Sequence, residues 1–484
     1  MRSDAVKFVL FPRPLLAMAM LVPFAVLAAQ DTPTEKAAAR DVLRKLDDAQ
    51  QKLAVPALVA RLTGPNPARD AVAARAKELM DKELLAMADD ITRHPEVGFK
   101  EERSVKILTD YLTAHDFTVT TGVAGLSTAF VAKYNKGTPG PNLGVILEYD
   151  ALRGTKGDFH GDQHSAQGPV GMAAAIAIAE FLTKSKTPGT VTVYGTPAEE
   201  MNPPAKRMMH EAHVFDGADV IVRSHSSTAT ARPAPGFGSC CLNIDAVKYI
   251  FSGAPSHQMI PWDGRDALTA AIQLFNNIDG IRRVMRPEAR IQGIITEGGK
   301  APNVVPDRAV ADFYIRYPDE VYLKQVREMV DNAARAAALA TGTKVKIEPY
   351  GGARDGVSES TLNEVAFAYL KRYGGGKVQE EYGKPQGFEE TGSVSRDIPG
   401  TGFSAYSSTG TYHTYEMEAD ALGPVGHNGF VVDAQAMAAL LFDFATRADY
   451  RAIVRQEFDG TKALFGDYIK SLGPAYPTPV VKDP

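Results

Sequence analysis

The 484-residue sequence is poor in cysteine and contains no long block of basic residues. Its two cysteines, Cys240 and Cys241, are adjacent, and neighbouring cysteines form a disulfide only with strain. We therefore expect no disulfide framework and interpret the pair as small residues in a strand. The formal net charge is −5, which together with the lack of a Lys/Arg cluster argues against a nucleic-acid partner.

Long apolar runs are also absent, except near the N-terminus. Three basic residues precede an apolar core over residues 15–27, and the small residues Ala28 and Ala29 follow it. This order predicts a secretory signal peptide over residues 1–29, because the core is too short to span a bilayer comfortably. The alternative is an uncleaved anchor helix. We expect a soluble, secreted protein, periplasmic if the source has two membranes, without membrane contact after cleavage.

A short polar loop carries the first chemical signal. It reads His160-Gly-Asp162-Gln-His164. Imidazole and carboxylate are the ligands that zinc and related ions use where no thiolate is offered, and alternate positions of extended backbone point the same way. Solvated polar turns have the same composition, so the loop alone leaves both interpretations open.

Three apolar runs elsewhere each end at acidic or histidine residues. Such runs are typical of strands buried on both faces of a parallel sheet, whose carboxyl ends meet at the edge where α/β proteins build their sites. We therefore expect these polar side chains to gather around the loop. The runs are 143–149 before Asp150, 190–195 before Glu199 and Glu200, and 219–223 before His225.

The length predicts more than one domain. Residues 242–352 read as strand, helix, strand, strand, helix, strand, which is the ferredoxin-like order and suggests a lid inserted into an α/β domain. We expect a mixed sheet flanked by helices for the rest. The remaining predicted segments are a helical N-terminal extension (30–81), the two parts of the α/β domain that carries the polar loop (82–241 and 353–450) and a loose C-terminal tail (451–484).

Several further histidines and acids lie in polar, turn-prone contexts. His413 and His427 lie in the segment in which the chain returns from the lid to the α/β domain, and they are candidates for a site there, although His427 alone would pass as a loop residue. His94 and Glu96 precede a predicted helix, and a turn role is the simpler interpretation for them.

An ordered set of motifs resembles the zinc aminoacylase, carboxypeptidase and amidohydrolase family, in particular its aminobenzoyl-glutamate hydrolase branch. The resemblance covers about residues 80 to 447. The motifs are Glu148-Tyr-Asp-Ala-Leu152, the 160–164 loop, Thr196-Pro-Ala-Glu-Glu200, Ser224-His225, Gly253-Ala-Pro-Ser-His257, the 298–307 segment and Tyr412-His-Thr414.

The resemblance implies a metal-dependent amidohydrolase with two divalent ions in each chain, zinc first and manganese or cobalt as alternatives. The implied ligands are Asp162, His164, Glu200, His225 and His413. Asp162 departs from the branch, which has a bridging Cys there, although other branches bridge with an aspartate. His160 fits a supporting role better than a ligand role.

The same resemblance assigns the remaining roles. Glu199 is the implied general base, Asp150 supports a ligand, and His257 from the lid stabilises the oxyanion. Asn303 and Arg316, which lie in the predicted lid strands, are expected to hold a substrate carboxylate because an amide and a guanidinium can pair with it, although Arg316 could equally be a surface strand charge. The lid is expected to form a homodimer and the substrate to be a small N-acyl or N-aroyl amino acid or a dipeptide. The alternatives are a non-catalytic binding relative and a peptidase acting on longer peptides.

Overall fold

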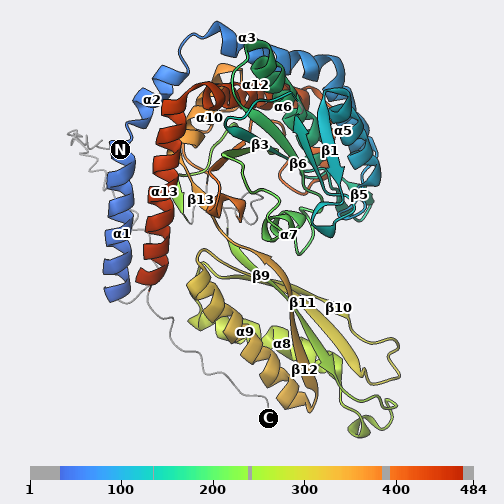
Figure 1. Cartoon of the computed structure of the whole chain (residues 1–484). Coiled ribbons are helices and arrows are strands. Elements are labelled where there is room, and N and C mark those ends of the chain that lie inside the picture. Colours follow the sequence, from blue (N-terminus) through green and yellow to red (C-terminus); the bar gives the residue numbers. More distant parts are fainter. Residues whose placement is uncertain (1–32, 135, 238–241, 384–392, 473–484) are drawn as a thin grey trace, which may run out of the picture.

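The structure, a computed structural model, describes residues 33–134, 136–237, 242–383 and 393–472. The predicted signal peptide, Cys240 and Cys241 lie outside these ranges. Two units are visible in Figure 1: a helix-covered sheet above and a four-stranded sheet with two helices below. The expected mixed α/β sheet with an inserted α+β lid is confirmed.

The larger unit is built on a six-stranded sheet with the order β1-β2-β6-β3-β7-β14. Neighbouring strands among β6, β3, β7 and β14 are parallel, whereas β2 runs antiparallel to β6. The carboxyl ends of the three predicted apolar runs therefore lie at one edge. The strands are β1 (Phe117–Thr121), β2 (Phe130–Tyr134), β3 (Asn142–Leu147), β6 (Thr190–Gly195), β7 (Val220–Ser224) and β14 (Gly400–Phe403).

Two long helices, α6 (His164–Ser185) and α12 (Pro424–Thr446), pack against each other and bury one face of the sheet. Small residues allow this close packing, because a Cβ at Gly171 would lie 2.3 Å from Leu147 Cδ2. Both helices are apolar and long enough to span a membrane, but most of their residues are buried, as in the core of a soluble protein.

The other helices cover the sheet and its edges. Val145 and Leu147 of β3 face the α6 side, while Ile146 joins a second core cluster with α7. The helices that cover the sheet and its edges are α4 (Leu85–Arg93), α5 (Glu102–Ala114), α7 (Ala205–Glu211), α10 (Ser360–Arg372) and α11 (Tyr415–Ala421).

The lid is an antiparallel sheet with the order β10-β11-β9-β12 and two helices on one face. Its first and last strands pair next to the larger unit, at Ile244 and Ala353, so both connections leave from one end of the lid. The elements are β9 (Asn243–Ser252), α8 (Ala267–Ile281), β10 (Arg290–Glu297), β11 (Arg308–Tyr317), α9 (Glu320–Thr341) and β12 (Lys344–Ala353).

The predicted loose tail is wrong for residues 451–471, because α13 (Ala448–Ser471) is a 24-residue helix. Tyr450 and Val454 are buried in the core of the larger unit, and Leu472 is buried in the lid core. The helix therefore connects both units. It packs against α1 (Pro33–Lys52) of the N-terminal extension, which continues through α2 (Val55–Leu62) and α3 (Pro67–Leu79).

Candidate metal centre and active site

The polar loop and the returning segment are tied together by hydrogen bonds to the backbone. The side-chain amide of Gln163 donates to the carbonyl oxygens of Ser407 (3.1 Å) and Met417 (2.8 Å). The backbone N–H of His413 donates to Gly161 O at 3.0 Å. These bonds bring His413 to the 160–164 loop although the two lie far apart in the chain.

Backbone strain accompanies this arrangement. Gln163 (φ 55°) and His413 (φ 62°) adopt left-handed conformations that non-glycine residues rarely take. Each costs about 1–3 kcal/mol and persists only where surrounding contacts hold it. Such strain clusters at functional sites.

All five predicted ligands come together at the sheet edge. Their ligand atoms form overlapping groups in which the atoms lie within 4.8 Å of one another. Asp162 belongs to two of these groups, so its carboxylate lies where one side chain can bridge two ions. Among the described residues the groups are Asp162, His164 and His225; Asp162, Glu200 and His413; and His164, Glu199 and Glu200.

Asp150 supports two of the ligands at once. Its Oδ1 lies 3.0 Å from His164 Nδ1, and its Oδ2 accepts the backbone N–H of Glu200 at 3.0 Å. A carboxylate on one ring nitrogen fixes the histidine tautomer and leaves the other nitrogen for a metal. The structure thus places Asp150 where a supporting residue belongs.

The electrostatics favour a cation. Burial raises the pKa of Glu200 well above its usual range. Burial alone would also raise the pKa of Asp162, but a hydrogen bond from His413 and the nearby His225 hold it below its usual value. A buried carboxylate pair of this kind is stabilised when a positive charge lies between the oxygens.

Unpaired buried atoms test whether a metal fits. Oδ1 of Asp162, Oε1 of Glu200 and Nε2 of His164 are buried and have no hydrogen-bond partner among the described residues. Buried polar atoms are normally paired. Two carboxylate oxygens and an imidazole nitrogen are the donors that zinc and related ions use, so the residues fit a divalent metal.

Comparisons with known proteins agree with this chemistry. The Peptidase dimerisation domain of the M20 family matches residues 237–341. The human Xaa-Arg dipeptidase is 30% identical over 410 residues, covering 79% of this chain and 91% of the relative. One of the subunits of the p-aminobenzoyl-glutamate hydrolase from Escherichia coli is 30% identical, covering 60% of this chain and 62% of the relative.

A solved structure has the same fold. The dinuclear metal-binding M20 peptidase from Bacillus subtilis superimposes with a TM-score of 0.54 at 21% identity, covering 76% of this chain and 99% of that one. This chain belongs to the M20 family. It is therefore a C–N bond hydrolase of the peptidase and amidohydrolase type.

One buried ion pair at the M20 site was not found from the sequence. Glu148 Oε2 lies 3.8 Å from His164 Nε2, and the Glu148 carboxylate pairs with Lys206 at the start of α7. Both side chains are buried. The motif containing Glu148 had been singled out, but nothing in the sequence linked it to a lysine so far along the chain.

His160 and His427, which were also considered as candidates, lie outside the ligand groups. His160 is buried, and burial together with the nearby His164 lowers its pKa to about 3. The interpretation of His427 as a loop residue is wrong, because His427 lies inside α12 and its Nε2 contacts Asp89 Oδ1 at 2.8 Å.

The lid residues are divided between two ends of the lid. His257 pairs with Val304 and lies beyond the far end of β9, which carries the chain about 30 Å from the junction. Asn303 is beside it, in a turn rather than the predicted strand, and its carbonyl accepts the N–H of Gln258. Figure 1 shows this end turned away from the larger unit.

Arg316 lies at the opposite end of the lid. It pairs with Ile244 next to the junction, and burial lowers the pKa of its guanidinium. One chain therefore does not bring His257 and Asn303 close to its own Arg316.

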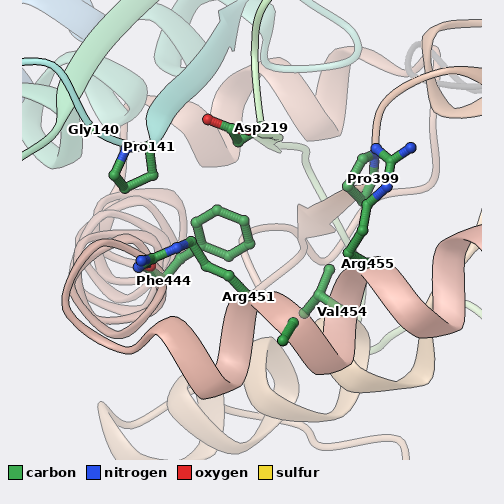
Figure 2. Close-up of a pocket in the computed structure, with 9 residues that line it drawn as sticks. Gly140, Pro141, Asp219, Pro399, Phe444, Arg451, Val454 and Arg455 are labelled. Atoms are coloured by element: carbon green, nitrogen blue, oxygen red, sulfur yellow. The ribbon is translucent and has the colours of Figure 1, made fainter.

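A separate cavity of about 490 Å³ lies at the amino ends of the parallel strands, opposite the metal ligands (Figure 2). Its polar groups are engaged within the chain: Arg455 pairs with Asp459, and Arg451 donates to the carbonyl oxygens that end α12.

Proposed function

We propose that the protein hydrolyses the amide bond of small N-acyl or N-aroyl amino acids or dipeptide-like compounds. The observation that carries the proposal is the pair of ligand groups sharing Asp162, with Glu199 next to the ligand Glu200. Both relatives are named as hydrolases of compounds of this kind, a dipeptide and an aroyl-glutamate.

Glu199 acts as the general base. Its carboxylate takes a proton from the attacking water and gives it to the nitrogen of the departing amine, so the products are a carboxylate and an amine. A well-placed acid/base group of this kind contributes about 100- to 10,000-fold. Asp150 keeps His164 and the backbone of Glu200 in place during the reaction.

Asp162, His164, Glu200, His225 and His413 hold two divalent ions, zinc first and manganese or cobalt as alternatives. The chemistry that these ions supply when bound is a lowered pKa of water and stabilisation of negative charge on the carbonyl oxygen. Asp162 would be the residue shared by the two ligand groups.

The lid forms a homodimer and completes the site. His257 lies at the far end of the lid of its own chain, so the partner's His257 donates to the developing oxyanion. Exposed apolar residues surround this end, with Trp262 72% and Met259 71% exposed. Large exposed apolar side chains gathered near one end of a domain are consistent with a protein interface there.

Arg316 and Asn303 bind the substrate carboxylate, Arg316 by a two-pronged pairing. Because the two residues lie at opposite ends of one lid, a single substrate is contacted by Arg316 of one chain and the partner's Asn303. The proposed export to the periplasm rests on the N-terminal sequence alone.

The first test is the metal content of the purified mature protein, together with hydrolysis of N-acyl amino acids, dipeptides and a peptide length series before and after chelation. About two ions per chain with chelator-sensitive cleavage of the small compounds supports the proposal. Metal without cleavage of any compound favours a binding protein, and faster cleavage of longer peptides favours a peptidase. Absence of metal refutes the proposed centre.

Glu199→Gln tests the base directly. Metal content should stay near two ions per chain while kcat falls at least about a hundredfold. Unchanged turnover removes Glu199 from this role.

A further inference from the structure

The turn that presents Glu199 and Glu200 is strained. Ala198 has φ 55°, and the N–H of Met201 returns to Ala198 O at 3.4 Å. Glu199 and Glu200 are the two central residues of this turn. Two successive side chains thus leave the backbone in different directions, one as a ligand and one as the proposed base. The strained residue before them costs about 1–3 kcal/mol, so other contacts must hold it.

Glu101 makes the contact that holds Ala198. Its Oε1 accepts the backbone N–H of Ala198 at 2.8 Å, and the side chain is fully buried. Burial and the nearby Asp150 raise the pKa of Glu101 to about 7, and a carboxyl oxygen accepts a backbone N–H whether or not the group is ionised. Ala198 is followed directly by Glu199, so a displacement of Ala198 reaches the proposed base first, whereas the backbone N–H of Glu200 is held separately by Asp150 at 3.0 Å.

The segment that carries Glu101 packs directly against the same turn. A Cβ at Gly98 would lie 2.4 Å from Met201 Cγ and 2.9 Å from Ala198 Cα, so only glycine permits the approach. Phe99, the next residue, also has a left-handed backbone, with φ 63°. The two strained turns therefore support each other.

This segment is itself firmly fixed. The carboxylate of Glu96 accepts the N–H groups of Arg103 (2.9 Å) and Ser104 (2.8 Å) at the start of α5. Its carbonyl accepts the N–H of Ala151, the neighbour of Asp150, at 2.8 Å. The 96–101 segment therefore joins the end of β3, where Asp150 supports two ligands, to the turn of the proposed base.

We propose that Glu101 is a positioning residue that fixes the general base by holding Ala198 in its left-handed conformation. This inference rests on the proposed role of Glu199. Without the bond, Ala198 relaxes towards an ordinary φ, and the Glu199 carboxylate moves away from the proton that it accepts. A displacement of about 1 Å at a catalytic group costs up to about a hundredfold in rate.

The decisive experiment is a double-mutant cycle between Glu101→Ala and Ala198→Gly. Glycine adopts positive φ at no steric cost, so in the Gly background the turn needs Glu101 less. We expect Glu101→Ala to lower kcat about 10- to 100-fold with KM within about twofold, and to lower it less than about fivefold when Ala198→Gly is present. Metal content stays at the wild-type level in all variants.

Three further variants complete the test. Glu101→Gln keeps an acceptor oxygen and should stay within about threefold of wild type. Glu102→Ala is the matched control, because it removes the neighbouring exposed carboxylate. Gly98→Ala should reproduce the kcat loss without removing any charge, since its Cβ displaces the Ala198 turn.

Unfolding in urea measures how much each substitution changes the free energy of unfolding, so it distinguishes a positioning role of Glu101 from a general loss of stability. The cycle should show the same sign of coupling in the free energy of unfolding, because Ala198→Gly removes the strain that Glu101 offsets. An unchanged kcat in Glu101→Ala, or an equal loss in both backgrounds, overturns the inference. Full activity of Glu199→Gln would instead refute the proposed base, whatever the Glu101 variants show.

Discussion

Asp162 offers the sharpest test of the metal centre, because its carboxylate belongs to two ligand groups. Asp162→Asn keeps the size of the side chain but removes the charge from a site where the side chain is only 8% exposed. One carboxylate oxygen is replaced by an amide nitrogen, which cannot bind a cation, so the side chain can no longer serve both groups and each group loses a negative charge.

The magnitude follows from the geometry. Loss of a group that merely supports a metal ligand weakens binding about 10- to 100-fold. Loss of a shared ligand should therefore weaken each ion by at least about a hundredfold, or about 2.7 kcal/mol per ion. His413, whose Nε2 lies 3.0 Å from Asp162 Oδ2, also loses its charged partner.

Equilibrium dialysis against zinc and manganese, followed by elemental analysis, measures the effect. Asp162→Asn should bind fewer than two ions at concentrations that saturate the wild type. Asp162→Cys is the matched control: a thiolate bridges as a carboxylate does, so two ions remain, with the preference shifted towards zinc. Two ions bound by Asp162→Asn with wild-type affinity would refute the bridging role.

Three further outcomes are expected. Trp262 is the single tryptophan of the chain, so its emission should shift to shorter wavelength on dimerisation, and Trp262→Ala should weaken the dimer in sedimentation by about tenfold or more; a concentration-independent monomer would contradict this. Glu457 accepts four hydrogen bonds from Ser360 and Thr361, so Glu457→Ala should lower the free energy of unfolding by about 2–4 kcal/mol, and Glu457→Gln by less. Burial raises the pKa of Asp319 to about 6, so the stability linked to its protonated form is complete near pH 4 and is lost as the pH rises through 6. The free energy of unfolding of Asp319→Asn should therefore rise relative to that of wild type by up to about 3 kcal/mol between pH 4 and pH 8. A difference that does not change with pH would refute this linkage.

The parts of the fold that repeat a simple pattern were predictable from the sequence. Continuous apolar runs identified β3, β6 and β7, and the direction of a parallel sheet then placed Asp150, Glu200 and His225 at one edge. The order of strands and helices likewise predicted the lid. Prediction succeeded where a single repeating pattern of apolar residues, set by burial of one face or both faces of an element, determined the structure.

The errors arose where long-range packing decides the local structure. Residues 448–471 are polar enough to read as a tail, yet Tyr450 and Leu472 each enter a different core and make the segment a helix between the two units. His427 was assigned to a turn because of its polar neighbours, but α12 continues through it. No local signal shows that a helix will find a partner surface.

The least predictable feature of the site is its strained backbone, which also shows how the site trades stability for function. Gln163 comes just before the proposed ligand His164, Ala198 comes just before the Glu199-Glu200 pair, and His413 is itself a proposed ligand. Each of the three has positive φ without being glycine. Glycine would relieve the backbone strain at Ala198, whereas at Gln163 it would also remove the side-chain amide that ties the loop down, and at His413 a proposed ligand. Each strained residue keeps its direction because a contact holds it: the carbonyl oxygens of Ser407 and Met417 for Gln163, the carboxyl group of Glu101 for Ala198 and the carbonyl oxygen of Gly161 for His413. Of these contacts, only that of Glu101 is made by the side chain of the anchoring residue, so substitution of Glu101 should lower turnover more than Ala198→Gly does.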